Sequence, residues 1–171
     1  MSSENIFPET YLFKDDGNIP NSKYPLLVYR NVFSGRGNEG AAWLEHRFSE
    51  NGWHNFWRWT IYPFHHYHSN THEVLGVFEG SAEICLGGPA GKKMTVTAGD
   101  ILVIPAGLAH RCISSTDGFT VVGAYPEGKS PDLIRAEASD HDAAVQSILQ
   151  VAVPGKDPVL GDAGGLVELW K

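Results

Sequence analysis

Residues 60–73 read TIYPFHHYHSNTHE, and this stretch decides the fold and the chemistry. Four of the chain's eight histidines stand here, at positions 65, 66, 68 and 72. In a β-strand, side chains two residues apart point the same way, so His66 and His68 can face one interior while His65 and Tyr67 face the other side. Two imidazoles with a carboxylate from Glu73 form a donor set that suits Fe(II), Mn(II), Co(II), Ni(II) or Zn(II).

A second stretch, residues 99–114, reads GDILVIPAGLAHRCIS and leads from a turn into a strand. If that strand lies beside the first, His110 supplies a third nitrogen. His72 is the awkward neighbour: it could replace Glu73 as a ligand, and we expect it instead to be exposed or to hydrogen-bond a ligand.

The spacing of these residues resembles the two motifs of the cupin superfamily. His66-x-His68-x4-Glu73-x6-Gly80 resembles the first motif. Gly99-x5-Pro105-x-Gly107-x2-His110 resembles the second, with Ser81–Ala98 between them. Two positions depart from the pattern, since Thr60 stands where the first motif begins with glycine and Ser114 where the second ends with asparagine.

The wider sequence resembles a bacterial branch of that superfamily, the YjlB-like cupins. Segments that carry this resemblance include Phe13–Gly17, Pro25–Tyr29, Asn51–Trp53, Tyr62–His68, Gly123–Pro126 and the final Leu169-Trp170. The resemblance implies a mainly β protein built on a single cupin domain, a double-stranded β-helix or jelly-roll barrel. It also implies that His66, His68, Glu73 and His110 bind a divalent metal ion whose identity stays unknown.

The order of predicted elements agrees with one domain. Residues 1–52 form an N-terminal arm and helix that pack on the barrel, residues 53–126 the barrel core, and residues 127–171 a C-terminal helix and tail. Apolar spacing predicts the first helix over 39–50, and Asp140 can cap a second that runs to Gln150. Between them the period changes to two, and turn residues separate seven short strands. The predicted strands are 53–62, 73–79, 82–86, 93–96, 101–104, 110–114 and 119–125; the arm adds extended pieces at 10–14 and 25–29, and the tail after residue 154 lies along the surface.

Composition excludes several classes of protein. The chain has 171 residues and a formal net charge of −7, which disfavours nucleic-acid and anionic membrane partners. Two cysteines are too few for a disulfide framework and are expected to be reduced. No apolar run reaches the ~18 residues of a membrane helix and no leader follows Met1, so we expect a cytoplasmic protein. Uncovered sheet edges lead us to expect a homodimer.

Residues around the ligands bear on the reaction. On a regular strand, Cys112 and Ser114 share the face of His110, so Cys112 is either a thiol beside the metal or a small buried apolar residue. In the strand before the first motif, unbroken alternation turns Arg58, Thr60 and Tyr62 inward, although Pro63 can shift that register. Arg58 would then bind an anionic substrate group. Apolar pocket walls are expected from Leu75, Val77 and Tyr125.

Several functions remain open at this point. The first is a small-molecule metalloenzyme, with a metal-dependent oxygenase (dioxygenase) or other oxidoreductase ahead of an isomerase or epimerase. The second is a non-catalytic cupin module that binds or senses a metal or a small molecule. Tyr62 and Cys112 are the candidate proton-transfer residues whose position discriminates between them. A storage barrel is the weakest hypothesis, because it has no need of clustered ligands.

Overall fold

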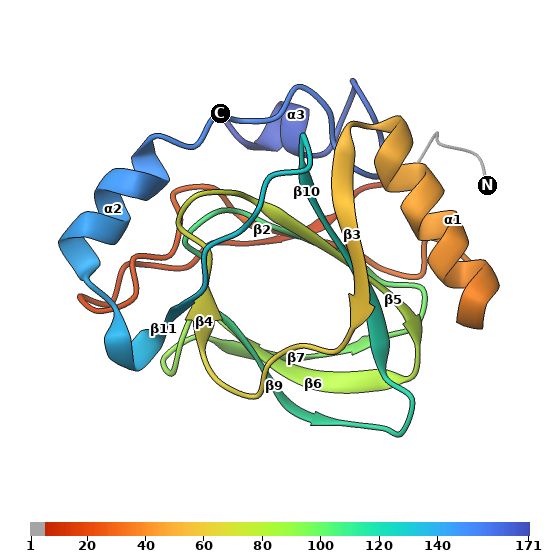
Figure 1. The fold of residues 1–171 in the computed structure, drawn as a ribbon, viewed down its shortest axis with the longest axis horizontal. Helices are drawn as coiled ribbons and strands as arrows, with labels where there is room; N and C mark the ends of the chain where they lie inside the picture. Colours follow the sequence, from red (N-terminus) through yellow and green to blue (C-terminus); the bar gives the residue numbers. More distant parts are fainter. Residues whose placement is uncertain (1–5) are drawn as a thin grey trace.

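The structure is a computed structural model that describes residues 6–171, and it consists mainly of antiparallel strands in two facing sheets (Figure 1). Strands of the larger sheet lie in the order β1 (Glu9–Tyr11), β2 (Leu26–Tyr29), β8 (Ile101–Ile104), β5 (Glu73–Glu79), β10 (Thr120–Pro126) and β3 (Trp53–Trp59). Those of the smaller sheet follow the order β11 (Ile134–Arg135), β4 (His66–Tyr67), β9 (His110–Ser115), β6 (Ser81–Leu86) and β7 (Lys92–Thr97). The helices are α1 (Gly37–Glu50), α2 (His141–Leu149) and α3 (Leu166–Leu169), with a 3₁₀ turn at Ala136–Ala138. The predicted jelly roll with helices packed outside is confirmed.

The larger sheet is buried on both faces. Leu102 and Ile104 of β8 point between the sheets into the barrel core, whereas Ile101 and Val103 pack on the other side against α1 and the C-terminal tail. Strands covered on two faces read as continuous apolar runs rather than alternating ones. This explains why ILVI at 101–104 is buried at every residue.

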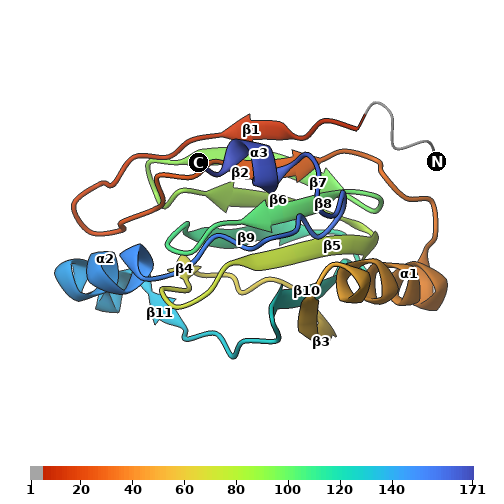
Figure 2. The same ribbon diagram turned by 90° about the horizontal axis from the view of Figure 1, so that it is seen from above.

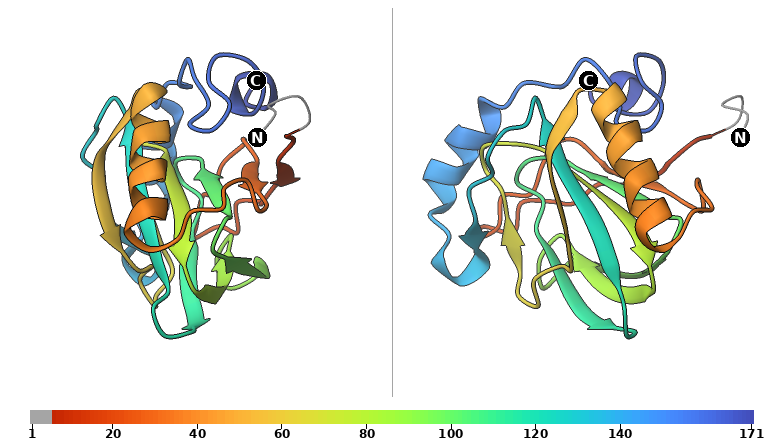
Figure 3. Two further views of the ribbon diagram at one scale, coloured as in Figure 1. Left: turned by 90° about the vertical axis from the view of Figure 1, so that its right-hand side faces the viewer. Right: turned by 45° about the vertical axis from the view of Figure 1, so that its right-hand side comes forward.

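Helix α1 lies across β3, β5 and β10, on the outside of the larger sheet (Figure 3). The apolar stripe predicted from its sequence, Ala41, Leu44 and Phe48, is the face that it buries. Its close approach requires glycine in β5, because a Cβ at Gly76 would lie 2.5 Å from a methyl carbon of Leu44. The helix begins at Gly37, two residues before the predicted start.

Helix α2 covers part of the outer face of the smaller sheet, at the end of the molecule opposite α1 (Figure 2). As predicted, Asp140 caps it, with the carboxylate accepting from the backbone N–H of Ala143 at 3.3 Å. Ala144 of α2 packs with Tyr67 of β4 and Ile19 of the N-terminal arm. None of the helices in residues 6–171 has the length and apolar character that crossing a bilayer demands.

The prediction that the C-terminal tail lies along the surface is wrong, because several of its residues are buried. Trp170 is buried and donates its indole N–H to the backbone carbonyl of Pro25 at 2.9 Å. The tail turns around a fully buried carboxylate, Asp157, which accepts from the Tyr29 hydroxyl at 2.7 Å. The same carboxylate accepts three backbone N–H groups, from Val159, Leu160 and Leu166. One acidic side chain therefore joins the tail to β2.

We predict that Asp157→Ala lowers the free energy of unfolding by about 3 kcal/mol, because it leaves a buried hydroxyl and several buried N–H groups without an acceptor. Urea unfolding followed by tryptophan fluorescence measures the change. Asp162→Ala is the matched control, since Asp162 is an exposed carboxylate of the same tail. Equal stability of the two variants would contradict this role for Asp157.

Candidate metal centre

A cavity of about 370 Å³ opens between the two sheets. Its volume is near the lower end of the range for small-molecule sites, about 300–1,000 Å³. Fourteen residues line it: Trp57, Trp59, Thr60, Ile61, Tyr62, His66, His68, Glu73, Leu75, His110, Tyr125, Pro131, Asp132 and Leu133.

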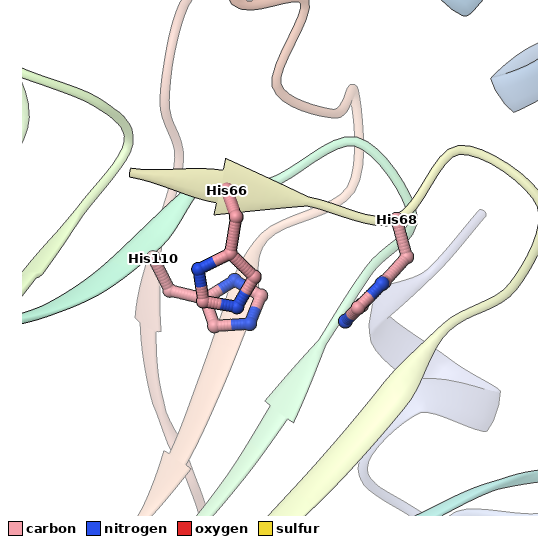
Figure 4. A group of neighbouring side chains, drawn as sticks. All are labelled: His66, His68 and His110. Carbon is pink, nitrogen blue, oxygen red and sulfur yellow. The ribbon is translucent and has the colours of Figure 1, made fainter. Parts of the chain in front are cut away.

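Three histidines converge on one wall of this cavity. His66 of β4 pairs directly with His110 of β9 across the smaller sheet, and their ring centroids lie 4.1 Å apart. His68 follows β4 and turns its ring toward the same point (Figure 4). One ring nitrogen from each of the three lies within 4.8 Å of the others, and all three residues are buried. The cluster could hold a metal ion.

Backbone carbonyls fix the proton on each imidazole. The Nδ1 atom of His66 donates to the carbonyl of Phe64 at 3.0 Å, and that of His110 donates to Leu108 at 3.1 Å. The Nδ1 atom of His68 donates to the carbonyl of Asp132. Because a carbonyl oxygen only accepts, each ring in its neutral form carries its proton on Nδ1 and has its lone pair on Nε2, where a ligand or a second proton can bind.

Glu73, the first residue of β5, faces this cluster from the larger sheet. Its carboxylate lies 3.2 Å from Nε2 of His110 and 3.4 Å from Nε2 of His68. Burial alone would raise the pKa of Glu73, but the positive charge of His68 and a hydrogen bond from His110 hold it well below its usual value. Burial opposes a charge on His68, yet the nearby carboxylate outweighs that effect and raises the pKa of His68. The Glu73 carboxylate is therefore ionised, and its charge favours the protonated form of His68.

His66 behaves differently from His68. Burial, together with the neighbouring His110, lowers the pKa of His66 to about 3. Its ring is therefore neutral throughout the ordinary pH range and its Nε2 lone pair needs no deprotonation.

Tyr125 and Trp57 hold the carboxylate from the other side. The Tyr125 hydroxyl donates to Oε2 of Glu73 at 2.8 Å and accepts the indole N–H of Trp57 at 2.8 Å. The indole packs against Gly123 of β10, where a Cβ would come within 2.2 Å of the ring. Burial and the carboxylate charge raise the pKa of Tyr125, so its proton stays in place. Gly123 thus admits the ring that orients the tyrosine.

The other two histidines of the first stretch lie outside the cluster. His65 is partly buried and its pKa is lowered by burial. His72 is buried, and both of its ring nitrogens are occupied away from the cluster. Its Nδ1 accepts the backbone N–H of Ala106 at 2.9 Å, and its Nε2 donates to the carbonyl of Ala152 at 3.1 Å. The expectation that His72 is exposed or bonded to a ligand is therefore wrong; it joins two loops to each other.

The predicted pocket residues divide into two groups. Thr60, Tyr62, Leu75 and Tyr125 line the cavity. Arg58 does not: its guanidinium is paired with Glu45 of α1 at 2.8 Å. The alternation along β3 is opposite to the one expected, and the odd-numbered tryptophans face the cavity. The regular strand ends at Trp59, so alternation stops there and residues 60, 61 and 62 all line the cavity.

Cys112, Ser114 and Val77 also do not line the cavity. Cys112 does face the barrel interior, as alternation predicts, but it is packed in the apolar core beside Ile84. A strand advances about 3.3 Å per residue, so positions two and four residues beyond His110 lie progressively farther from the cluster. Ser114 is exposed, and Val77 is buried in the same core.

Several lining residues were not predicted from the sequence. Trp57 and Trp59 could have been found from the sequence, because they occupy the alternate positions of the strand that carries Arg58 and so face the opposite side. Asp132 carried no signal in the sequence: it lies in the loop before β11, where its carboxylate accepts the backbone N–H of Ser69 at 2.7 Å and also the Ser69 hydroxyl. That pairing holds the loop against residues 68–69.

Comparisons with known proteins agree with this architecture. A family model described as "Cupin domain" matches residues 59–122. The chain is 42% identical to "Uncharacterized protein YjlB" of Bacillus subtilis (strain 168) over 163 residues, which cover 95% of this chain and 96% of the relative.

Solved structures show weaker likeness. A Klebsiella pneumoniae protein with a double-stranded β-helix domain is 16% identical, covering 80% of this chain and 84% of its own, with a TM-score of 0.38. Bacillus subtilis oxalate decarboxylase, described as having Mn(II) centres, is 14% identical and covers 69% of this chain and 29% of its own, with a TM-score of 0.37.

The burial of His72 predicts a pH-dependent stability. Burial lowers the pKa of His72 to about 4, whereas an unfolded histidine titrates near 6.5. The unfolded chain therefore binds the proton first as pH falls. The contribution of His72 to stability is complete above about pH 6.5 and is lost progressively between that value and about pH 4. Between pH 7 and pH 5 the expected loss is about 2 kcal/mol.

Since His66 contributes in the same direction, His72→Gln isolates this effect. We expect the variant to be less stable than wild type at pH 7 and to lose about 2 kcal/mol less on acidification to pH 5. Urea midpoints at the two pH values measure it, and parallel pH dependence in both proteins would refute the assignment.

Proposed function

The chain belongs to the cupin superfamily, in the branch of Bacillus subtilis YjlB, and from this premise we propose that it is a divalent-metal-binding enzyme acting on a small molecule. The ligands would be His66, His68 and His110, with Glu73 as the fourth. The small molecule would bind in the cavity beside them.

The observation that carries the proposal is the common tautomer of the three histidines. Each Nδ1 proton is held by a backbone carbonyl, and the free nitrogens gather beside an ionised carboxylate. Three imidazole nitrogens and one carboxylate oxygen suit Fe(II), Mn(II), Co(II), Ni(II) or Zn(II). Bound there, such an ion supplies Lewis-acid chemistry or, if it is iron or manganese, one-electron redox chemistry.

Among the reaction classes, we favour an oxygenase or other oxidoreductase over an isomerase. An isomerase or epimerase needs a residue that moves a proton on the substrate. Here Glu73 faces the histidines, Tyr125 is bonded to Glu73, and Asp132 is bonded to Ser69. Among the residues that the structure describes, Tyr62 is the acid–base group that remains in the cavity lining. Cys112 does not line the cavity. Redox chemistry makes less demand on such groups.

The same scarcity of acid–base residues favours, as second candidate, a cupin that binds a metal or small molecule without transforming it. Tyr62 separates the two. If Tyr62→Phe leaves ligand binding intact and no reaction with O₂ or substrate is measurable in either protein, the binding module is the better description.

We predict that the purified protein carries near-stoichiometric divalent metal and that His68→Ala loses most of it. Metal content is measured by mass spectrometry after gel filtration. His65→Ala is the matched control, because His65 lies in the same stretch but outside the cluster, and it is expected to keep wild-type metal. Equal trace metal in wild type and His68→Ala would remove the basis of the proposal.

Metal affinity should also increase with pH. The Glu73 carboxylate raises the pKa of His68 above the ordinary value of about 6.5, and wherever His68 is protonated a metal ion must displace that proton. Because binding releases one proton below the pKa of His68, the apparent Kd of the metal falls by up to about tenfold for each unit by which the pH rises. Co(II) titrations at pH 6 and pH 7 measure the slope. The same Kd at both values would show that His68 is not a ligand that must first lose a proton.

A further inference from the structure

Aromatic side chains form much of the cavity beyond the histidines. Four of the fourteen lining residues are Trp57, Trp59, Tyr62 and Tyr125. Trp59 is 52% exposed, and its ring meets that of Tyr62 edge-on at 5.2 Å. Tyr62 in turn meets the His66 ring at 5.3 Å. A path of rings thus runs from the solvent-facing tryptophan to the cluster, and Trp57, packed against Gly123, lies in the same cavity wall.

The charge of the lining is one-sided. Its ionisable side chains, apart from the histidines and tyrosines, are the carboxylates Glu73 and Asp132, and within residues 6–171 no lysine or arginine lines the cavity. Burying an ionised group without a partner costs several kcal/mol. A carboxylate or phosphate on the far end of a ligand would find no cation here.

Nearby arginines are already engaged elsewhere. Arg58 is paired with Glu45 of α1. Arg135 of β11 lies over the Phe64 ring, 3.9 Å from its centroid, and its Nε donates to Glu137 at 2.8 Å. Arg111 adjoins His110 in β9, and alternation turns its side chain to the opposite face of the sheet.

Free hydrogen-bonding groups are also few. The Tyr125 hydroxyl serves Glu73 and Trp57, and the Asp132 carboxylate serves Ser69. Outside the cluster, the lining hydroxyls that remain are those of Thr60 and Tyr62. A sugar needs a partner for each hydroxyl that it buries, since an unpaired polar group costs about 1–3 kcal/mol.

We propose that the ligand of this cavity is an uncharged small molecule with a flat aromatic or conjugated body and one hydroxyl or carbonyl oxygen that faces the histidines. Sugar phosphates and dicarboxylates are disfavoured. The inference rests on the proposed function in that the oxygen would meet the metal, while the aromatic preference comes from the cavity wall.

Calorimetric titration of Zn(II)-loaded protein with three probes tests it. The probes are 1-naphthol, 1-naphthyl phosphate, which differs by one phosphoryl group, and glucose 6-phosphate. We expect the Kd of 1-naphthol to be at least tenfold lower than that of 1-naphthyl phosphate, and no measurable binding of glucose 6-phosphate. The comparison is stringent, because a bound metal ion would by itself attract the phosphate.

Two variants at the mouth extend the test. Trp59→Arg adds a cation at an exposed position and is expected to reduce the preference for 1-naphthol at least fivefold, whereas Trp59→Phe keeps it within twofold. Thermal melting verifies that both variants fold. A cavity that selects by aromatic contact and charge predicts this contrast, and an unchanged preference in Trp59→Arg would count against it.

Metal content measured in the same samples tests the proposed metal site separately from the proposed ligand class. Bound metal with 1-naphthyl phosphate or glucose 6-phosphate preferred would overturn the ligand class alone. Preference for 1-naphthol without metal retention would overturn the metal site and leave the ligand class supported. Failure of all three probes to bind metal-loaded protein would also overturn the ligand class.

Discussion

A carboxylate buried in an apolar barrel is the constraint on which this site depends. Glu73 opens a strand whose next five residues are buried, and an isolated charge at that depth would be neutralised rather than ionised. It stays ionised because His68 and His110 face it from the opposite sheet. Burial and charge thus make the two sheets interdependent: the larger sheet supplies the carboxylate, and the histidines that favour its charge face it from the other side of the cavity.

The arrangement is held in place by backbone as much as by side chains. Two of the three imidazoles donate to the carbonyl two residues earlier in the chain, just before the strand that each histidine begins: His66 to Phe64 and His110 to Leu108. Their orientation therefore follows from local chain geometry. His68 depends instead on the distant loop that carries Asp132, which Ser69 ties down. Order in that loop is consequently a condition for the third nitrogen to face the other two.

Sequence reasoning succeeded where the physics is periodic or local. The spacing of His66 and His68 predicts a shared face, and β4 does pair with β9 in the register that sets His66 against His110. The prediction that Arg58 faces the cavity failed. It extended the alternation of side chains from His66 back to Arg58, but alternation holds only within a regular strand, and this strand ends at Trp59. For Cys112, the predicted face was correct, but sequence parity says nothing about how far along the strand a cavity extends.

What the sequence could not supply are partners brought from far along the chain. His72 looked like a candidate ligand because it adjoins Glu73, yet its nitrogens are taken by Ala106 and Ala152. Those bonds place the turn before β9 and the segment after α2 against the start of β5. His110 follows Ala106 by four residues, and Glu73 is the first residue of β5. His72 therefore acts on the cluster through the backbone and not through its ring. A histidine beside a candidate metal cluster can thus position the cluster's residues through the backbone without belonging to the cluster.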